Sequence, residues 1–233
     1  MFKGKRILVV VAHPDDELLG LGATMHKLIK EEGVVAKAII LGEGITSRSD
    51  SRDVKKWKVI LEKHHENMRL AAEIIGYKEV KCYNFSDNRF DSHALLDIVK
   101  VVEKEKEDFQ PDIIFTHNGS DLNVDHQRTF EAVVTATRPM DDERVSTVVT
   151  FETPSATEWQ ASNIIPKFTP NLYVEVSDND MKAKVDAMNC YEFETRLYPH
   201  PRSDEALYLL AKFRGMQVGK GYVEAFCLIR TIL

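Results

Sequence analysis

The sequence predicts an α/β fold with a doubly wound, mostly parallel sheet and helices on both faces. Three observations lead to this prediction. Four short aliphatic runs, typical of strands buried on both faces, alternate with amphipathic stretches of helical length. Parallel strands need crossover connections, which are usually helices and almost always right-handed. The chain has 233 residues, enough for one such domain with a substantial core.

The regular alternation begins with a continuous aliphatic run from Ile7 to Val11. The helix at 55–75 is the most clearly periodic, because its apolar residues recur every three or four positions and Gly76 follows as a stop. In this part of the chain, strands are expected at residues 7–11, 34–41, 80–85 and 112–116, and helices at 18–32, 55–75, 95–110 and 125–138.

Beyond Val148 the alternation loosens. Strands are expected there at residues 147–152, 172–176 and 223–229, and helices at 179–191 and 204–216. No repeat, low-complexity tract or linker divides the chain, so we expect a single domain over residues 1–233 with an elaborated C-terminal third. Strands that alternate with helices in this way are typical of a Rossmann-like arrangement.

The charge balance is mildly acidic, because 31 Lys and Arg face 37 Asp and Glu, a formal net charge of −6. Phosphate binding needs clustered basic side chains, and the chain has no long basic block, so we expect no nucleic-acid partner. The apolar run at 7–12 is too short for a signal peptide or a membrane span. Cys82, Cys190 and Cys227 are widely spaced without a CxxC pair, which favours reduced thiols and a cytoplasmic location.

Polar and titratable side chains follow each of the four early strands. These segments are 13–17, 42–44, 86–89 and 117–126. In an open parallel sheet, ligands bind outside the carboxyl ends of the strands. We therefore expect one site at this edge of the sheet. His64 and His65 lie inside the long predicted helix and are expected to be structural or solvated.

Two histidines and one carboxylate on this edge favour a metal site. His13 and Asp16 are three residues apart across a turn, and His126 is placed to supply a third ligand. Two His ligands, one carboxylate and an open position are typical of catalytic zinc. Asp15 is then placed to remove a proton from a water, which predicts hydrolysis of a carbonyl compound. The alternative for each acidic residue is capping of the following helix.

The segment Ala12–Glu17, with the sequence AHPDDE, resembles the signature of the PIG-L family, also called LmbE-like. Members of this family are metal-dependent de-N-acetylases that act on N-acetylglucosamine units of glycoconjugates. The segment Asn123–His126 is similar to the second family motif, a His or Asn followed by any residue, Asp and His. Weaker similarities extend the resemblance over nearly the whole chain.

The resemblance implies a role for five residues. His13, Asp16 and His126 would bind Zn²⁺, with Fe²⁺ as the alternative. Asp15 would be the general base and would return the proton to the leaving amine. Asp125 would orient a neighbouring group from behind the metal ligands. The products would be acetate and a glucosamine-type amine.

One position departs from the family pattern, since several relatives carry a His where this chain has Asn123. A protonated His there is thought to help stabilise the oxyanion, whereas Asn cannot act as an acid. His200 is a candidate replacement, and a loop histidine without a special role is the alternative. Asp87 and Arg89 are candidates for binding sugar hydroxyls, against the alternative that they only form a turn.

These observations favour a metal-dependent N-deacetylase that acts on a small-molecule N-acetyl sugar conjugate. A second hypothesis is a metal-dependent hydrolase that cleaves a different amide, for instance in a thiol or antibiotic pathway. A third is a non-catalytic sugar- or nucleotide-binding module. The C-terminal third offers surface for association of identical chains, so a homo-oligomer is also expected.

Overall fold

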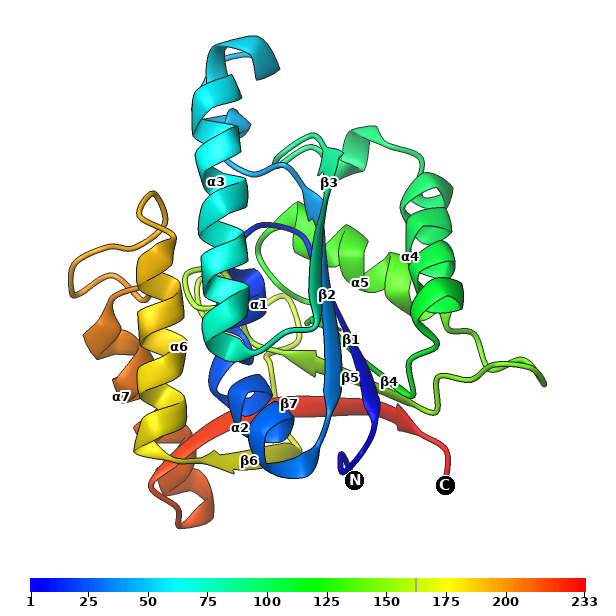
Figure 1. The fold of residues 1–233 in the computed structure, drawn as a ribbon, viewed down its shortest axis with the longest axis vertical. Coiled ribbons are helices and arrows are strands. Elements are labelled where there is room, and N and C mark those ends of the chain that lie inside the picture. Colours follow the sequence, from blue (N-terminus) through cyan, green and yellow to red (C-terminus); the bar gives the residue numbers. More distant parts are fainter. Residues whose placement is uncertain (162) are drawn as a thin grey trace.

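A computed structural model describes residues 1–161 and 163–233. One mixed sheet of seven strands, in the order β3-β2-β1-β4-β5-β7-β6, crosses the molecule (Figure 1). The first five strands of this order pair in parallel, and β7 runs antiparallel to both of its neighbours. The strands are β1 Arg6–Val11, β2 Val35–Gly42, β3 Glu79–Phe85, β4 Ile113–His117, β5 Thr147–Phe151, β6 Leu172–Val176 and β7 Tyr222–Thr231. The predicted fold class is confirmed.

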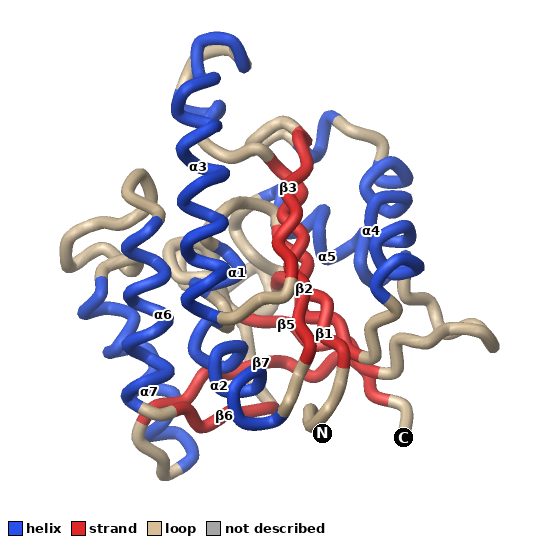
Figure 2. Tube along the Cα trace, in the orientation of Figure 1, coloured by secondary structure: helices blue, strands red, loops and turns tan. Residues whose placement is uncertain are grey.

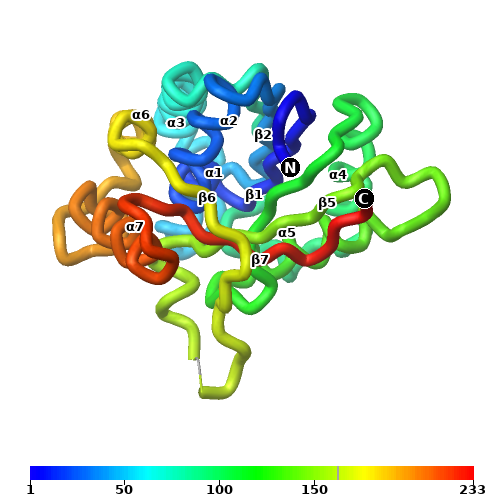
Figure 3. The backbone as a smooth tube through the Cα atoms, turned by 90° about the horizontal axis from the view of Figure 1, so that it is seen from below, coloured from blue at the N-terminus to red at the C-terminus, as the bar shows by residue number. Residues whose placement is uncertain are grey.

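Helices cover both faces of this sheet (Figure 2). The helices α1, α2, α3 and α6 lie on one side, and α4 and α5 lie on the other. Seen from below, α7 lies beside β7 (Figure 3). The helices are α1 Asp16–Leu19, α2 Gly22–Glu32, α3 Val54–Ile75, α4 Leu95–Phe109, α5 Val124–Ala136, α6 Asp178–Cys190 and α7 Asp204–Val218, with short 3₁₀ turns η1 Thr46–Arg48 and η2 Phe90–Ser92.

Alternate residues of the central strands supply two separate cores. In β1, the side chains of Ile7, Val9 and Val11 join the cluster under α1, α2, α3 and α6. Leu8 and Val10 point to the other face and join the cluster under α4 and α5. A strand buried on both faces reads as a continuous apolar run, which is why β1 is visible in the sequence.

The single helix expected at 18–32 is wrong, because the structure has two helices separated by Gly20 and Leu21, and Leu21 has a non-helical backbone (φ −153°, ψ 18°). A Cβ atom on Gly20 would lie 2.1 Å from the ring of Phe151, so the backbone passes too close to β5 for any other residue. Lys184 donates to the Leu19 carbonyl (2.8 Å), while Glu224 accepts from the backbone of α2. These partners lie far along the chain, so local periodicity could not reveal the break.

The direction in which successive strands are added to the sheet reverses between β1 and β4, although the two strands are parallel. The connections from β1 lead outward through β2 to β3, and those from β4 lead the opposite way to β5. The loops that follow β1 and β4 therefore diverge and leave a crevice at the carboxyl edge, the usual ligand position in doubly wound sheets. His13 follows β1 directly, and His117 is the last residue of β4.

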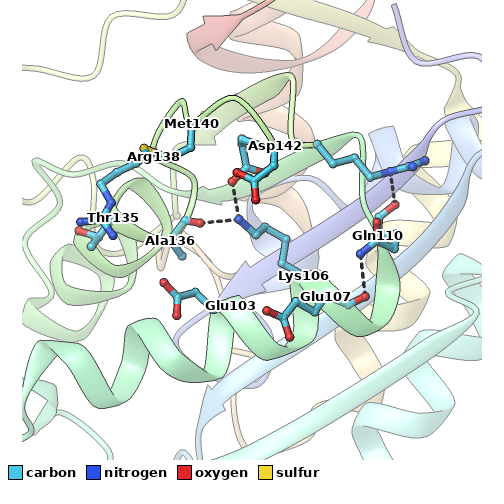
Figure 4. Close-up of a pocket in the computed structure, with 11 residues that line it drawn as sticks. Glu103, Lys106, Glu107, Gln110, Thr135, Ala136, Arg138, Met140 and Asp142 are labelled. Carbon is cyan, nitrogen blue, oxygen red and sulfur yellow. Dashed lines mark hydrogen bonds and ion pairs between the residues drawn. The ribbon is translucent and has the colours of Figure 1, made fainter.

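A separate cavity lies between α4 and the segment that follows α5 (Figure 4). Lys106 donates to the Ala136 carbonyl (2.7 Å) and pairs with Glu143, and Arg144 donates to the Gln110 carbonyl (3.0 Å). These bonds connect α4 to the chain before β5, so Lys106, Glu143 and Arg144 of the cavity lining already have structural partners. No helix in residues 1–161 or 163–233 has both the length and the apolar character needed to cross a membrane.

Candidate active site

His13, Asp16 and His126 converge at the crevice between β1 and β4. His13 follows β1, Asp16 is the first residue of α1, and His126 lies in the first turn of α5. One ligand atom from each of the three lies within 4.8 Å of the others. Residues more than a hundred positions apart in the sequence thus meet because adjacent parallel strands end at the same edge.

The spacing of these atoms suits a small divalent cation. Asp16 Oδ2 lies 3.5 Å from His13 Nδ1 and 3.4 Å from His126 Nε2. Two ligands bound tetrahedrally to Zn²⁺ at ~2.0–2.1 Å are about 3.3 Å apart. Asp16 therefore already stands close to this separation from each of the two histidines.

Unpartnered buried atoms also point to a missing cation. Asp16 Oδ1 and both ring nitrogens of His126 are buried and have no hydrogen-bond partner within the described part of the chain. Leaving such a group unsatisfied costs about 1–3 kcal/mol, and native proteins rarely tolerate it without a reason. A metal ion bound between Asp16 and His126 would take up the free Asp16 oxygen and His126 Nε2, whereas His126 Nδ1 lies 3.3 Å from Asp121 Oδ1 on the opposite side of the ring.

Asp125 fixes the orientation of His13. Its Oδ2 lies 2.9 Å from His13 Nε2 and accepts the Asn88 N–H (2.7 Å), while its Oδ1 accepts the Phe90 N–H (2.9 Å). This network assigns the imidazole proton to Nε2 and leaves the Nδ1 lone pair facing Asp16. A carboxylate behind a metal-binding histidine is a common arrangement in metalloproteins. Because backbone N–H groups already occupy its oxygens, Asp125 fits this supporting position better than that of a ligand.

The carboxylates and histidines of the site shift one another's pKa values strongly. Burial alone would raise the pKa of Asp16, but the neighbouring His126 holds it well below its usual range. Burial alone would lower the pKa of His126, but Asp16 and Asp121 raise it to about 9. The pKa of His13 is likewise raised well above its ordinary value, because its hydrogen bonds to Asp125 and Asp16 outweigh burial. Bound protons therefore occupy positions that a metal ion would take.

His117 supports this site and was not among the predicted site residues. Its Nε2 accepts the Ala12 N–H (2.9 Å), so that lone pair is already used. Burial and then the charge of His126 lower the pKa of His117 to about 4, which keeps the ring neutral. The two rings stack with centroids 3.9 Å apart. The sequence placed both histidines on the same edge but could not show which one has a free nitrogen.

Asp15 lies beside the metal-site residues with its carboxylate in the pocket wall. It has a left-handed backbone (φ 106°), which is strained for a residue other than glycine. Its Oδ2 accepts from Arg202 Nη1 at 2.6 Å. Burial raises the pKa of Asp15 well above its usual range, and the Arg202 guanidinium opposes this rise.

The remaining predicted residues divide into two groups. Asp87 and Asn123 line the pocket together with His13 and Asp15. Asp87 is buried, and Asn123 caps α5 by accepting the Asp125 N–H (2.8 Å).

Arg89 and His200 are not among the residues that line this pocket. Arg89 is exposed and begins the short turn η2. His200 accepts the backbone N–H of Arg202 (3.2 Å) and meets Trp159 edge-on. His200 thus contacts the backbone of a residue that lines the pocket rather than the pocket itself.

Four further titratable residues of the pocket wall come from distant segments, and sequence reasoning did not select them. They are Arg48, His64, Glu194 and Arg202. His64 is buried, and its Nε2 lies 3.5 Å from Glu194 Oε1. It is therefore not solvated, and it lies at the pocket wall rather than away from it. The one sequence signal was the Pro-His-Pro-Arg-Ser stretch, in which Arg202 lies two residues beyond His200.

Comparisons with known proteins agree with the sequence motifs. Residues 8–137 match the family model PIG-L, described as GlcNAc-PI de-N-acetylase. The uncharacterized deacetylase YaiS of Escherichia coli is 28% identical over 192 residues, covering 80% of this chain and 90% of YaiS. The diacetylchitobiose deacetylase of Thermococcus kodakarensis is 27% identical over 228 residues, covering 94% of this chain and 81% of that enzyme. The conserved protein TT1542 of Thermus thermophilus superposes with a TM-score of 0.76 at 20% identity, covering 98% and 96% of the two chains.

Proposed function

The chain belongs to the PIG-L family of de-N-acetylases, and from that premise we propose that it is a zinc-dependent hydrolase of an N-acetylglucosamine-type sugar or glycoconjugate. The observation that carries the proposal is the convergence of His13, Asp16 and His126 beside Asp15. The substrate class is supported by the relative named as a diacetylchitobiose deacetylase, which acts on an acetylated sugar. Cleavage of the amide C–N bond would release acetate and the free amine.

The donor set supports Zn²⁺ as the metal. Two imidazole nitrogens and one carboxylate oxygen, with room for a further ligand, are typical of catalytic zinc, and the same donors also suit Fe²⁺. His13, Asp16 and His126 would hold the ion, and Asp125 would keep His13 in the ligating tautomer. When bound, such an ion supplies a Lewis acid that polarises a carbonyl oxygen and lowers the pKa of a water.

Asp15 is the proposed general base. Its carboxylate would accept the proton of the attacking water and then deliver that proton to the nitrogen of the leaving amine. The residue is buried next to Asp16, at the wall of the pocket that also contains His13. This position supports transfer of a proton from the attacking water to the leaving nitrogen.

Asp87 and Asn123 are proposed to bind sugar hydroxyls, because each presents polar atoms at the pocket wall. Arg89 is exposed and would contact only a part of the substrate that extends beyond the pocket. His200 is outside the pocket lining, so we do not propose that it replaces the family histidine that is absent at Asn123.

Three further expectations stay predictions. A cytoplasmic location still rests on the cysteines, all three of which are free thiols. A single domain over residues 1–233 and a homo-oligomeric state also stay predictions.

The proposal is tested by acetate release from N-acetylglucosamine conjugates that are UDP-linked, lipid-linked or part of an oligosaccharide. We expect turnover by the zinc-loaded protein and its loss in Asp15→Asn, with metal retained. Asp91→Asn, an exposed carboxylate outside the pocket lining, is the matched control and should stay active. Turnover of a non-sugar amide alone would favour the second hypothesis. Sugar binding without any acetate release would favour a binding module.

The ligand set is tested separately by metal content. His13→Ala and His126→Ala should each lose stoichiometric Zn²⁺ after dialysis, whereas His65→Ala, an exposed histidine on α3, should retain it. Stoichiometric metal in both site variants would refute the ligand assignment.

A further inference from the structure

We propose that Arg202 is the positioning residue that holds the Asp15 carboxylate in one orientation, and that Glu194 in turn holds Arg202. The inference rests on the proposed function insofar as Asp15 is the general base. It concerns residues from the C-terminal part of the chain, beyond the segment that the family model matches.

Arg202 connects three segments that are far apart in the sequence. Its Nη1 donates to Asp15 Oδ2 at 2.6 Å and also contacts Glu194 Oε2 at 3.2 Å. Its Nε donates to Ser155 Oγ at 2.8 Å. The start of α1, the chain after β5 and the chain after α6 therefore meet at one guanidinium group. A planar guanidinium directs its donors in a fixed geometry, which a lysine cannot reproduce.

The backbone of Arg202 is itself well supported. Its N–H donates to His200 Nδ1 (3.2 Å). The next residue, Ser203, caps α7 by accepting the Ala206 N–H (3.1 Å). The arginine side chain thus extends from the start of a 15-residue helix, and its origin is as rigid as that helix.

Glu194 keeps Arg202 in this position from the opposite side. Its Oε1 accepts from Arg48 Nη2 at 2.7 Å, and its Oε2 contacts Arg202. Its side chain is only 12% exposed, so these charge-assisted bonds are poorly screened by solvent. Arg48 belongs to η1, the short turn after β2, so the alternating charges Asp15–Arg202–Glu194–Arg48 cross the pocket wall.

Asp15 needs such a partner because little else directs its carboxylate. Arg202 is its one side-chain partner within residues 1–161 and 163–233, apart from the contact of its backbone N–H with Glu17 (3.0 Å). The neighbouring Asp16 and Glu17 are carboxylates and repel it. A general base must stand within about 2.6–3.2 Å of the proton it accepts, and a displacement near 1 Å can cost about 100-fold in rate. An ion pair at 2.6 Å supplies the missing constraint.

The test compares Arg202→Gln and Arg202→Lys with Arg214→Gln. Arg214 is a matched control, because it forms a similar two-pronged, largely buried pair with Glu152 (2.7 and 2.5 Å) outside the pocket lining. We expect kcat to fall about 100-fold in Arg202→Gln, with KM changed by less than about threefold and metal content unchanged. Arg202→Lys should retain part of the activity, and Arg214→Gln should retain all of it.

A readout without turnover keeps the inference independent of the substrate. In crystal structures, Asp15 should adopt more than one orientation in Arg202→Gln and a single one in Arg214→Gln. Glu194→Gln should disorder Arg202 and lower kcat less than Arg202→Gln does, and it replaces that variant if the latter does not fold. If the wild type releases no acetate, the proposed function fails while the orientation of Asp15 still decides the inference. The positioning role of Arg202 would be overturned if the Asp15 carboxylate kept its single orientation in Arg202→Gln, or if that variant had a higher KM with unchanged kcat.

Discussion

Replacement of Asp125 by Asn is the sharpest probe of how the site is built. The Asp125 carboxylate is fully buried and accepts from two backbone N–H groups, those of Asn88 and Phe90, and from His13 Nε2. An amide has the same shape but only one acceptor oxygen. Whichever way it is turned, its NH₂ group must face at least one buried N–H.

The magnitude follows from this conflict. One buried donor left unsatisfied costs about 1–3 kcal/mol, which for a chain of this length lowers the Tm by about 2–12 °C. If the amide NH₂ faces His13, that ring must accept at Nε2 and carry its proton on Nδ1, the nitrogen that faces Asp16. Loss of such a supporting carboxylate lowers metal affinity about 10- to 100-fold.

Both effects are measurable with metal-free protein, by thermal unfolding and by Zn²⁺ titration against a competing chelator. Asp180→Asn is the matched control, because Asp180 is also buried and accepts from the Ser177 backbone and from His26. We expect Asp180→Asn to lose comparable stability and to bind Zn²⁺ normally. A Zn²⁺ affinity in Asp125→Asn that matches the wild type would refute the role given to Asp125.

Two other predictions concern stability. The pKa of His126 rises from 6.5 to about 9 on folding. Protonation of His126 therefore stabilises the metal-free protein by about 3 kcal/mol below pH 6.5, and this stabilisation is lost as the pH rises to 9. Thermal unfolding should show this loss in the wild type and a much smaller one in His126→Ala. Glu105→Gln leaves the buried Lys37 with only the carboxylate of Glu79 as an ion-pair partner. Calorimetry should therefore show that the free energy of unfolding falls by about 2–3 kcal/mol, with unchanged turnover. Its control, the exposed Glu107→Gln, should change neither quantity.

The elements that were predicted most accurately are those whose stability is local or whose hydrophobic pattern is unambiguous. The strand Arg6–Val11 and the helix Val54–Ile75 were predicted to within one residue at each end, because a buried strand and a long amphipathic helix have distinct periodicities. The break between α1 and α2 was missed, because Phe151, Lys184 and Glu224, which contact this region, lie far along the chain. The position of β7 between β5 and β6 was also not predicted, since strand order is not encoded in periodicity.

The predicted site residues near the strand ends were brought together except for Arg89, whereas His200, which was inferred from a loop, lies outside the pocket lining. His13, Asp16 and His126 converge because parallel strands β1 and β4 are neighbours and both end at the crevice. His200 was selected by residue type alone, and the structure instead presents Arg202 to Asp15. His200 and Arg202 are only two residues apart, and their segment has no regular periodicity that would show which of the two side chains faces the pocket.

The sequence by itself determined the α/β class, the edge at which chemistry collects and the motif residues His13 to Asp16. These depend on hydrophobic periodicity and on short-range spacing, which are local properties of the chain. Only the tertiary structure decided that His117 is neutral while His126 has free nitrogens, and that Arg202 and Glu194 close the pocket wall. Two of the deciding contacts, Ala12 with His117 and Asp15 with Arg202, join residues that are 105 and 187 positions apart, and no local pattern records such contacts.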